Sequence, residues 1–170
     1  MRYQQRFITA VWLAGMVSLG AQATDINLSG TVIASPCTVD TASVSQDVNF
    51  GQLRNTDLKT AGATSDWQPF EVKLKNCPVS TTTATVTFNG TQFVDDATLY
   101  ANAGTAARVA VQMAQAANKS LVQGNGSSMT VNVDAQHNAT YALAGRVISP
   151  AGNSGPGTVN SVVQMNFTYQ

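Results

Sequence analysis

The final segment, residues 157–170, constrains the fold more than any other part of the chain, because it has the pattern of a single β-strand. Apolar side chains stand at Val159, Val163, Met165, Phe167 and Tyr169, and polar residues stand between them at Asn160, Gln164, Asn166 and Thr168. Alternation with period two gives a strand one apolar and one polar face. Such a strand must lie in a sheet to bury its apolar face, yet no later residue is left to pair with its outer edge. We therefore expect the neighbour on that side to come from earlier in the chain or from another molecule.

Residues 1–23 have the composition of an export signal. Arg2 and Arg6 give a basic start, residues 7–19 form an apolar run of thirteen, and residues 21–23 make a small-residue cleavage pattern. Thirteen apolar residues are few for crossing a bilayer. Removal of this segment leaves 147 of the 170 residues, enough for one domain with a core. The remainder has seven basic and nine acidic residues, so it offers no basic surface for nucleic acid.

The expected mature chain contains two cysteines, Cys37 and Cys77. In an exported protein an even pair most simply forms a structural disulfide. A disulfide between them would close a loop of about forty residues, which stabilises a fold by roughly 4 kcal/mol in the chain-entropy treatment. The alternative, a redox or metal-binding pair, is disfavoured because the two cysteines lie far apart and have no further ligand types beside them.

Short runs of alternating apolar residues, separated by turn residues, recur along the chain and predict an all-β fold. The expected runs contain Ile26, Leu28 and Val32; Val44, Val48 and Phe50; Phe70, Val72 and Leu74; Ala84, Val86 and Phe88; Val109, Val111 and Met113; and Tyr141, Leu143 and Val147. Alanines between 101 and 117 would also suit a helix, but Gly104 and the period of the larger side chains favour a strand. Leu121 and Val122, with the turn at 124–126, predict a hairpin to Met129, Val131 and Val133. Residues 52–65 and 150–157 are expected to be loops.

Few residues in the chain can carry catalysis or hold a metal. His137 is the single histidine and stands near Asp134 in a polar stretch. An exposed turn is the favoured interpretation, because zinc sites need three or four ligands. Asp95 and Asp96 form the one carboxylate pair, but adjacent strand residues point to opposite faces, so a solvated loop is favoured. We therefore expect no enzymatic activity, no cofactor, no metal site and no nucleic-acid partner.

The start of the expected mature chain, Thr24 to Val32, also alternates. Ile26, Leu28 and Val32 share one face, and Gly30 stands where a fourth side chain would be. A glycine within a strand marks a place where another backbone or a bulky neighbour comes close. The segment can be an ordinary first strand of a sandwich. However, Cys37 tethers the chain only seven residues after Gly30, so the segment before Gly30 can stand free of its own domain.

Together these features resemble the pilins of the chaperone–usher pathway, and most of all the small tip adaptors of type 1 fimbriae. The resemblance covers the signal, the alternating extension with its glycine, the segments around Pro36-Cys37 and Asn76-Cys77-Pro78, residues 61–67 and the terminal strand. Gly157 stands fourteenth from the end and Tyr169 second, as in the pattern of the family. Ser161, at the tenth position, is a polar departure from that pattern.

The resemblance implies an incomplete immunoglobulin-like sandwich that lacks its last strand. It divides the chain into a signal peptide (1–23), an N-terminal donor-strand extension (24–32) and a pilin domain (33–170). The implied donor residues are Ile26, Leu28, Gly30 and Val32. The implied acceptor groove, which is also the chaperone-binding strand, contains Gly157, Val159, Val163, Met165, Phe167 and Tyr169.

The resemblance also implies a function. The chain would be a structural subunit of a fimbria, a minor tip adaptor, that polymerises by donor-strand exchange and supports cell adhesion. It would be exported through the periplasm to the cell surface, with a periplasmic chaperone, an outer-membrane usher, neighbouring subunits and a tip adhesin as partners. Two alternatives stay open: a major shaft pilin of the same pathway, and a stand-alone secreted carbohydrate-binding β-sandwich, which would be a soluble monomer without any chaperone.

Overall fold

The computed structural model describes residues 29–30 and 36–170. The expected signal peptide and the donor residues Ile26, Leu28 and Val32 lie outside the described residues. Within the described part of the chain, no helix is long and apolar enough to cross a membrane.

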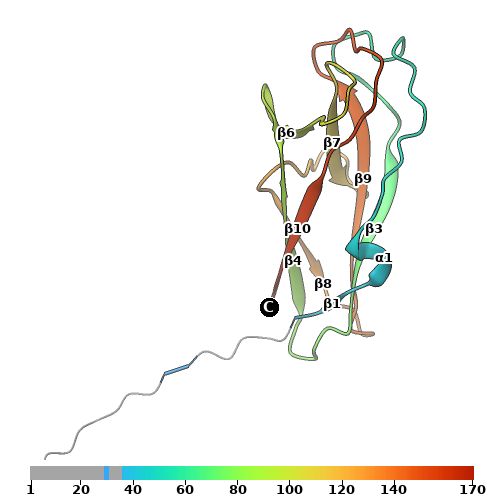
Figure 1. Ribbon diagram of the computed structural model, residues 1–170. Helices are drawn as coiled ribbons and strands as arrows, with labels where there is room; N and C mark the ends of the chain where they lie inside the picture. The colour runs from blue at the N-terminus through green and yellow to red at the C-terminus, as the bar shows by residue number, and fades with distance from the viewer. Residues whose placement is uncertain (1–28, 31–35) are drawn as a thin grey trace, which may run out of the picture. The chain divides into compact units, whose positions relative to one another are not determined.

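Two antiparallel sheets form the folded unit (Figure 1). The larger sheet has the order β1 (Thr38–Val39), β3 (Gln68–Lys75), β9 (Ala139–Ser149), β7 (Ala110–Gln115), β6 (Asp96–Ala101) and β5 (Gln92–Phe93), with β2 (Ala63–Thr64) also paired to β9. The smaller sheet has the order β10 (Val163–Tyr169), β4 (Thr83–Gly90) and β8 (Ser128–Asn132). The expected all-β fold is confirmed.

The period-two patterns form strands because each gives the core one apolar face. In β4, Ala84, Val86 and Phe88 are fully buried, and they pack in one cluster with Leu74 of β3 and Leu143 of β9. The core therefore lies between the two sheets, as in a sandwich. The outward face of β4 is polar, and its hydroxyls pair with those of β8: Thr85 with Thr130 at 2.8 Å, and Thr87 with Ser128 at 3.1 Å.

The predicted disulfide joins Cys37 to Cys77, and both residues are buried. The bridge lies at the edge of the larger sheet, where Thr38 of β1 pairs with Lys75 of β3. It therefore fixes the start of the folded unit to the end of a long core strand.

The predicted strand through Val44, Val48 and Phe50 is wrong. Asp40 accepts a hydrogen bond from the Ala42 amide and caps a four-residue helix, α1 (Thr41–Val44), and Val44 is 70% exposed. A carboxylate at an N-cap accepts a hydrogen bond from a free amide of the first turn and so favours a helix. This preference outweighs the weak alternation of apolar residues that favoured a strand. Phe50 still reaches the core, because Gly145 of β9 leaves room for its ring.

The predicted hairpin around 124–126 is also wrong. β8 pairs with β4, and Val122 makes an isolated bridge to Ala114. Two apolar residues are too few to hold a partner strand, whereas β4 offers a complete ladder. The strands β5 and β6 were not anticipated either: Asp95 is exposed in the turn between them, and Asp96 begins β6.

Two tyrosines bury hydroxyl groups without a hydrogen-bond partner among residues 29–30 and 36–170. Tyr100 and Tyr141 are both 0% exposed, and neither hydroxyl contacts an acceptor in this part of the chain. Burial disfavours the phenolate, so it raises the pKa of Tyr100 to about 12 and raises the pKa of Tyr141 as well. An unfolded tyrosine titrates near pH 10, so the unfolded chain loses these protons first. The associated stability is present below pH 10 and is lost as the pH rises through the folded pKa values.

Replacement of both residues by phenylalanine should leave the free energy of unfolding at pH 8 unchanged or slightly higher, because an unsatisfied buried hydroxyl contributes nothing favourable. Above pH 10 the wild type should lose up to about 1.4 kcal/mol per pH unit for each tyrosine, whereas the double variant should not show this loss. Urea unfolding at pH 8, 10 and 11 measures the difference. If the free energy of unfolding fell equally steeply with pH above pH 10 in both proteins, the stability change could not be attributed to Tyr100 and Tyr141.

Gly157 lies where two backbone segments meet. Its φ is +152°, and a Cβ there would lie 2.4 Å from the backbone nitrogen of Ala106. A side chain therefore clashes with backbone that cannot move away, in a conformation that favours glycine.

Gly157→Ala should reduce the free energy of unfolding by more than about 1 kcal/mol. Gly155→Ala is the matched control, because its Cβ would lie 3.4 Å from the Ala107 Cβ, an ordinary contact. Urea unfolding of both variants makes the comparison. A Gly157→Ala protein as stable as the Gly155→Ala protein would show that the close approach has no energetic consequence.

Candidate functional site

The candidate site is the free edge of β10. The strand pairs with β4 over seven residues, from Val163 opposite Gly90 to Tyr169 opposite Ala84. On its other side, none of the residues in 36–162 forms a ladder with it. Figure 1 shows β10, in red, beside β4 and running to the C-terminus.

The backbone pairing shows which groups of β10 face this edge. Gln170 and Thr83 exchange two hydrogen bonds, at 3.0 and 2.9 Å. In an antiparallel ladder such pairs alternate with pairs whose N–H and C=O groups point away from the partner. Even-numbered residues of β10 therefore bond to β4, while the N–H and C=O groups of its odd-numbered residues point to the free edge.

The same odd-numbered residues carry the apolar side chains. Val163, Met165, Phe167 and Tyr169 are half-buried and pack against the core from one side, and Val159, which precedes β10, continues the row. Ser161 occupies its place in this row and is also half-buried, whereas the even-numbered residues 162–170 are exposed. The ring of Phe167 lies 5.7 Å from that of Tyr141 below it. We call this row and the free edge beside it the groove.

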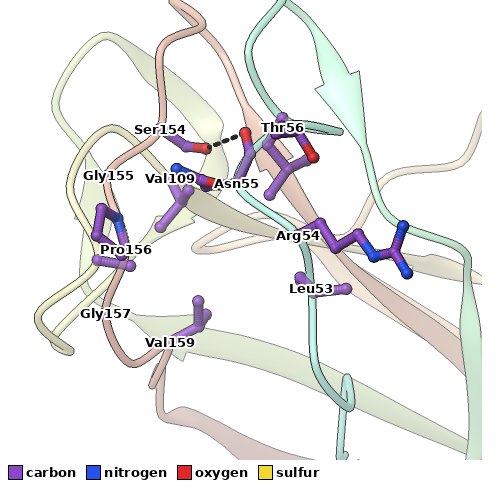
Figure 2. Close-up of a pocket in the computed structure, with 12 residues that line it drawn as sticks. Leu53, Arg54, Asn55, Thr56, Val109, Ser154, Gly155, Pro156, Gly157 and Val159 are labelled. Atoms are coloured by element: carbon purple, nitrogen blue, oxygen red, sulfur yellow. Dashed lines mark hydrogen bonds between the residues drawn. The ribbon is translucent and has the colours of Figure 1, made fainter.

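A pocket of about 430 Å³ lies at the Val159 end of the groove (Figure 2). It is lined by Leu53, Arg54, Asn55, Thr56, Leu58, Ala106, Val109, Ser154, Gly155, Pro156, Gly157 and Val159. Figure 2 shows Leu53, Pro156 and Val159 around the hollow, with the Arg54 guanidinium extending away from it. The lining is mixed: the apolar residues are Leu53, Leu58, Ala106, Val109, Pro156 and Val159, and the polar residues are Arg54, Asn55, Thr56 and Ser154. The apolar part of the pocket fits an aliphatic side chain.

Sequence reasoning missed one side of this pocket. Leu53 and Leu58 belong to the stretch 52–65, which was predicted to be a loop, and most of it is irregular. Leu58 is nevertheless only 5% exposed and packs with Val109 and Val147. The sequence feature that could have indicated its burial is that Leu58 is a large apolar residue with polar neighbours.

The remaining predicted residues in the described part of the chain are Gly30 and His137. Gly30 is exposed, and no atom lies within 4 Å of the place where its Cβ would be. His137 lies in an exposed turn with a φ of +61°. Within residues 29–30 and 36–170, no group of three or more His, Cys, Asp or Glu side chains could hold a metal ion.

The chain is similar to fimbrial proteins over its whole length. A family model described as fimbrial protein matches residues 26–170. An uncharacterized fimbrial-like protein, YdeR of Escherichia coli K12, is 32% identical over 99% of each chain. Protein FimG of the same organism is 31% identical, again over 99% of each chain.

The fold is also found in a solved pilus. A structure of a chaperone–usher pilus aligns with a TM-score of 0.67, at 22% identity, over 92% of this chain and 100% of the pilus subunit. At this identity the likeness concerns the fold alone, and it agrees with the immunoglobulin-like sandwich expected from the resemblance. The residues that match the fimbrial family model extend to Gln170 and therefore include the groove. The chain therefore belongs to the fimbrial protein family and is a structural fimbrial subunit.

Proposed function

We propose that this subunit polymerises by strand addition, in which the groove beside β10 receives an extended segment of a neighbouring subunit. The observation that carries the proposal is the coincidence of two features on the same residues. The odd-numbered residues of β10 present unpaired backbone groups at the edge and half-buried apolar side chains beside it. An added strand with alternating apolar side chains would pair with these backbone groups and cover these side chains at the same time.

The chain's own segment Thr24–Val32 has the chemistry of such a strand. Ile26, Leu28 and Val32 would enter the groove of the next subunit, and Gly30 would mark the closest approach of the two backbones. Burying three aliphatic side chains contributes roughly 5 to 9 kcal/mol. Each ladder hydrogen bond adds about 1 kcal/mol. A linkage of this strength dissociates rarely.

The proposed donor strand offers a candidate occupant for the pocket. All pairings in the described sheets are antiparallel, and antiparallel ladders are slightly more stable than parallel ones. An antiparallel donor places its N-terminal residues beside Tyr169 and its C-terminal residues beside Val159. Val32 is then the donor residue nearest the pocket, and Ile26 lies at the other end of the groove.

Before assembly the groove needs another cover, because an open strand edge promotes aggregation. In our proposal residues 1–23 direct export, a periplasmic chaperone lends a strand to the edge of β10, and an outer-membrane usher exchanges it for the extension of the next subunit. The assembled fimbria would stand at the cell surface and support adhesion.

We assign the chain a minor adaptor role, following its resemblance to type 1 tip adaptors. The fold does not discriminate here, because a rod subunit, PapA, and an adaptor subunit, PapF, align with it at TM-scores of 0.64 and 0.53. Counting subunits in purified fimbriae separates the roles, since a shaft pilin would be present in great excess. The stand-alone carbohydrate-binding module would instead behave as a stable monomer without a chaperone.

Leu28→Asp should abolish incorporation of the chain into fimbriae and leave its own fold intact, because the substitution places a carboxylate at a buried donor position. Asn27→Asp is the matched control. It introduces the same charge one residue away, on the opposite face of the donor strand. Immunoblotting of sheared fimbriae measures incorporation. Normal incorporation of the Leu28→Asp chain would refute the donor role.

A further inference from the structure

The pocket end of the groove is held by a hydrogen-bonded clamp. Asn102 lies after β6, and its side chain joins the β6–β7 loop to the segment before β10. Its Nδ2 donates to the carbonyl oxygens of Ala106, at 2.9 Å, and Thr158, at 3.2 Å. Its Oδ1 accepts from the amides of Gly104, at 2.9 Å, and Asn160, at 2.8 Å. One side chain thus satisfies four backbone groups from two segments far apart in sequence.

Thr105 and Thr158 reinforce the clamp reciprocally. The Thr105 amide donates to the Thr158 hydroxyl oxygen at 3.0 Å, and the Thr158 amide donates to the Thr105 hydroxyl oxygen at 2.9 Å. Backbone bonds from Ala103 to Asn160, at 2.7 Å, and from Ala106 to Thr158, at 3.0 Å, complete the contact.

Residues 157–162 need this support because β4 does not provide it. The ladder between β10 and β4 begins at Val163, opposite Gly90. Before that point the apolar row of the groove continues through Val159, which lines the pocket together with Ala106. Each of these wall residues lies next to a clamped backbone group: Val159 stands between Thr158 and Asn160, and the Ala106 carbonyl accepts from Asn102.

We propose that Asn102 is a positioning residue for strand addition, which holds the pocket wall so that the groove selects the side chain at the end of the inserted strand. This inference rests on the proposed function. Asn102 contacts no donor residue in this account. It acts through Val159 and Ala106, and without it the groove keeps its central part, which β4 supports, but loses its selectivity at the Val159 end.

The experiment measures binding of fluorescent peptides with the sequence of residues 24–32 to the intact, oxidised chain by competition anisotropy. Three peptides are compared: wild type, Val32→Ala and Leu28→Ala. Against the wild-type chain, Val32→Ala should weaken binding about 10-fold, the effect of removing two buried methyl groups. Against Asn102→Ala, the penalty for Val32→Ala should fall below about threefold, whereas the penalty for Leu28→Ala should be unchanged.

Asn118→Ala is the matched control, because the Asn118 side chain holds a different loop by accepting from the Ser120 amide at 3.1 Å. This variant should keep the full Val32 penalty. Asn102→Asp provides a second variant should Asn102→Ala not refold. It keeps the two acceptor contacts and loses the two donor contacts, so the Val32 penalty should be intermediate.

The outcomes separate the two claims. If the wild-type chain binds none of the peptides, the proposed function fails. If the wild-type chain binds and shows the Val32 penalty, but Asn102→Ala or Asn102→Asp shows the same full penalty, only the positioning role fails. Equal loss of the Leu28 and Val32 penalties in Asn102→Ala would indicate general loosening and would also overturn the positioning role.

Discussion

The free edge of β10 is the constraint on which the rest of the structure depends. The strand packs its apolar side chains against the core from one side, and β4 satisfies only half of its backbone groups. An edge that is both apolar and unpaired is a template for any extended chain, so a secreted protein must either cover it or use it. The pocket and the clamp at the Val159 end extend this edge beyond the ladder with β4, which lengthens the surface available to an incoming strand.

Much of the fold could be predicted because the long strands report their surroundings locally. In β3, β4 and β10 one face contacts the core and the other does not, so burial imposes a period of two on the order of apolar and polar residues. That period can be recognised in the sequence directly. The disulfide was predicted from the expected export signal and the even number of cysteines. The apolar residues of β10 alternate as predicted, although they are only half-buried. The predicted strand over 157–170 is too long, because β10 begins at Val163, where its ladder with β4 begins.

The parts that could not be predicted depend on partners far away in sequence. Strands of two residues, such as β2 and β5, carry no period, so their position is set by β9 and β6. The choice of β8 to pair with β4 rather than with Leu121 and Val122 depends on the complete ladder that β4 offers. The clamp is a property of two loops that meet only after folding, and an asparagine in an alanine-rich stretch gives no sign of it beforehand.

The position of the disulfide has a mechanical consequence for a fibre built in this way. Tension on the fibre would act on a subunit through its N-terminal extension, and Cys37 stands on that path directly before β1. The two-residue strand β1 would peel from β3 under little force. The covalent bond to Cys77 bypasses β1 and delivers the load to the end of β3, whose ladder with β9 spans seven residues. Pulling would therefore shear a long core strand instead of unzipping a short one.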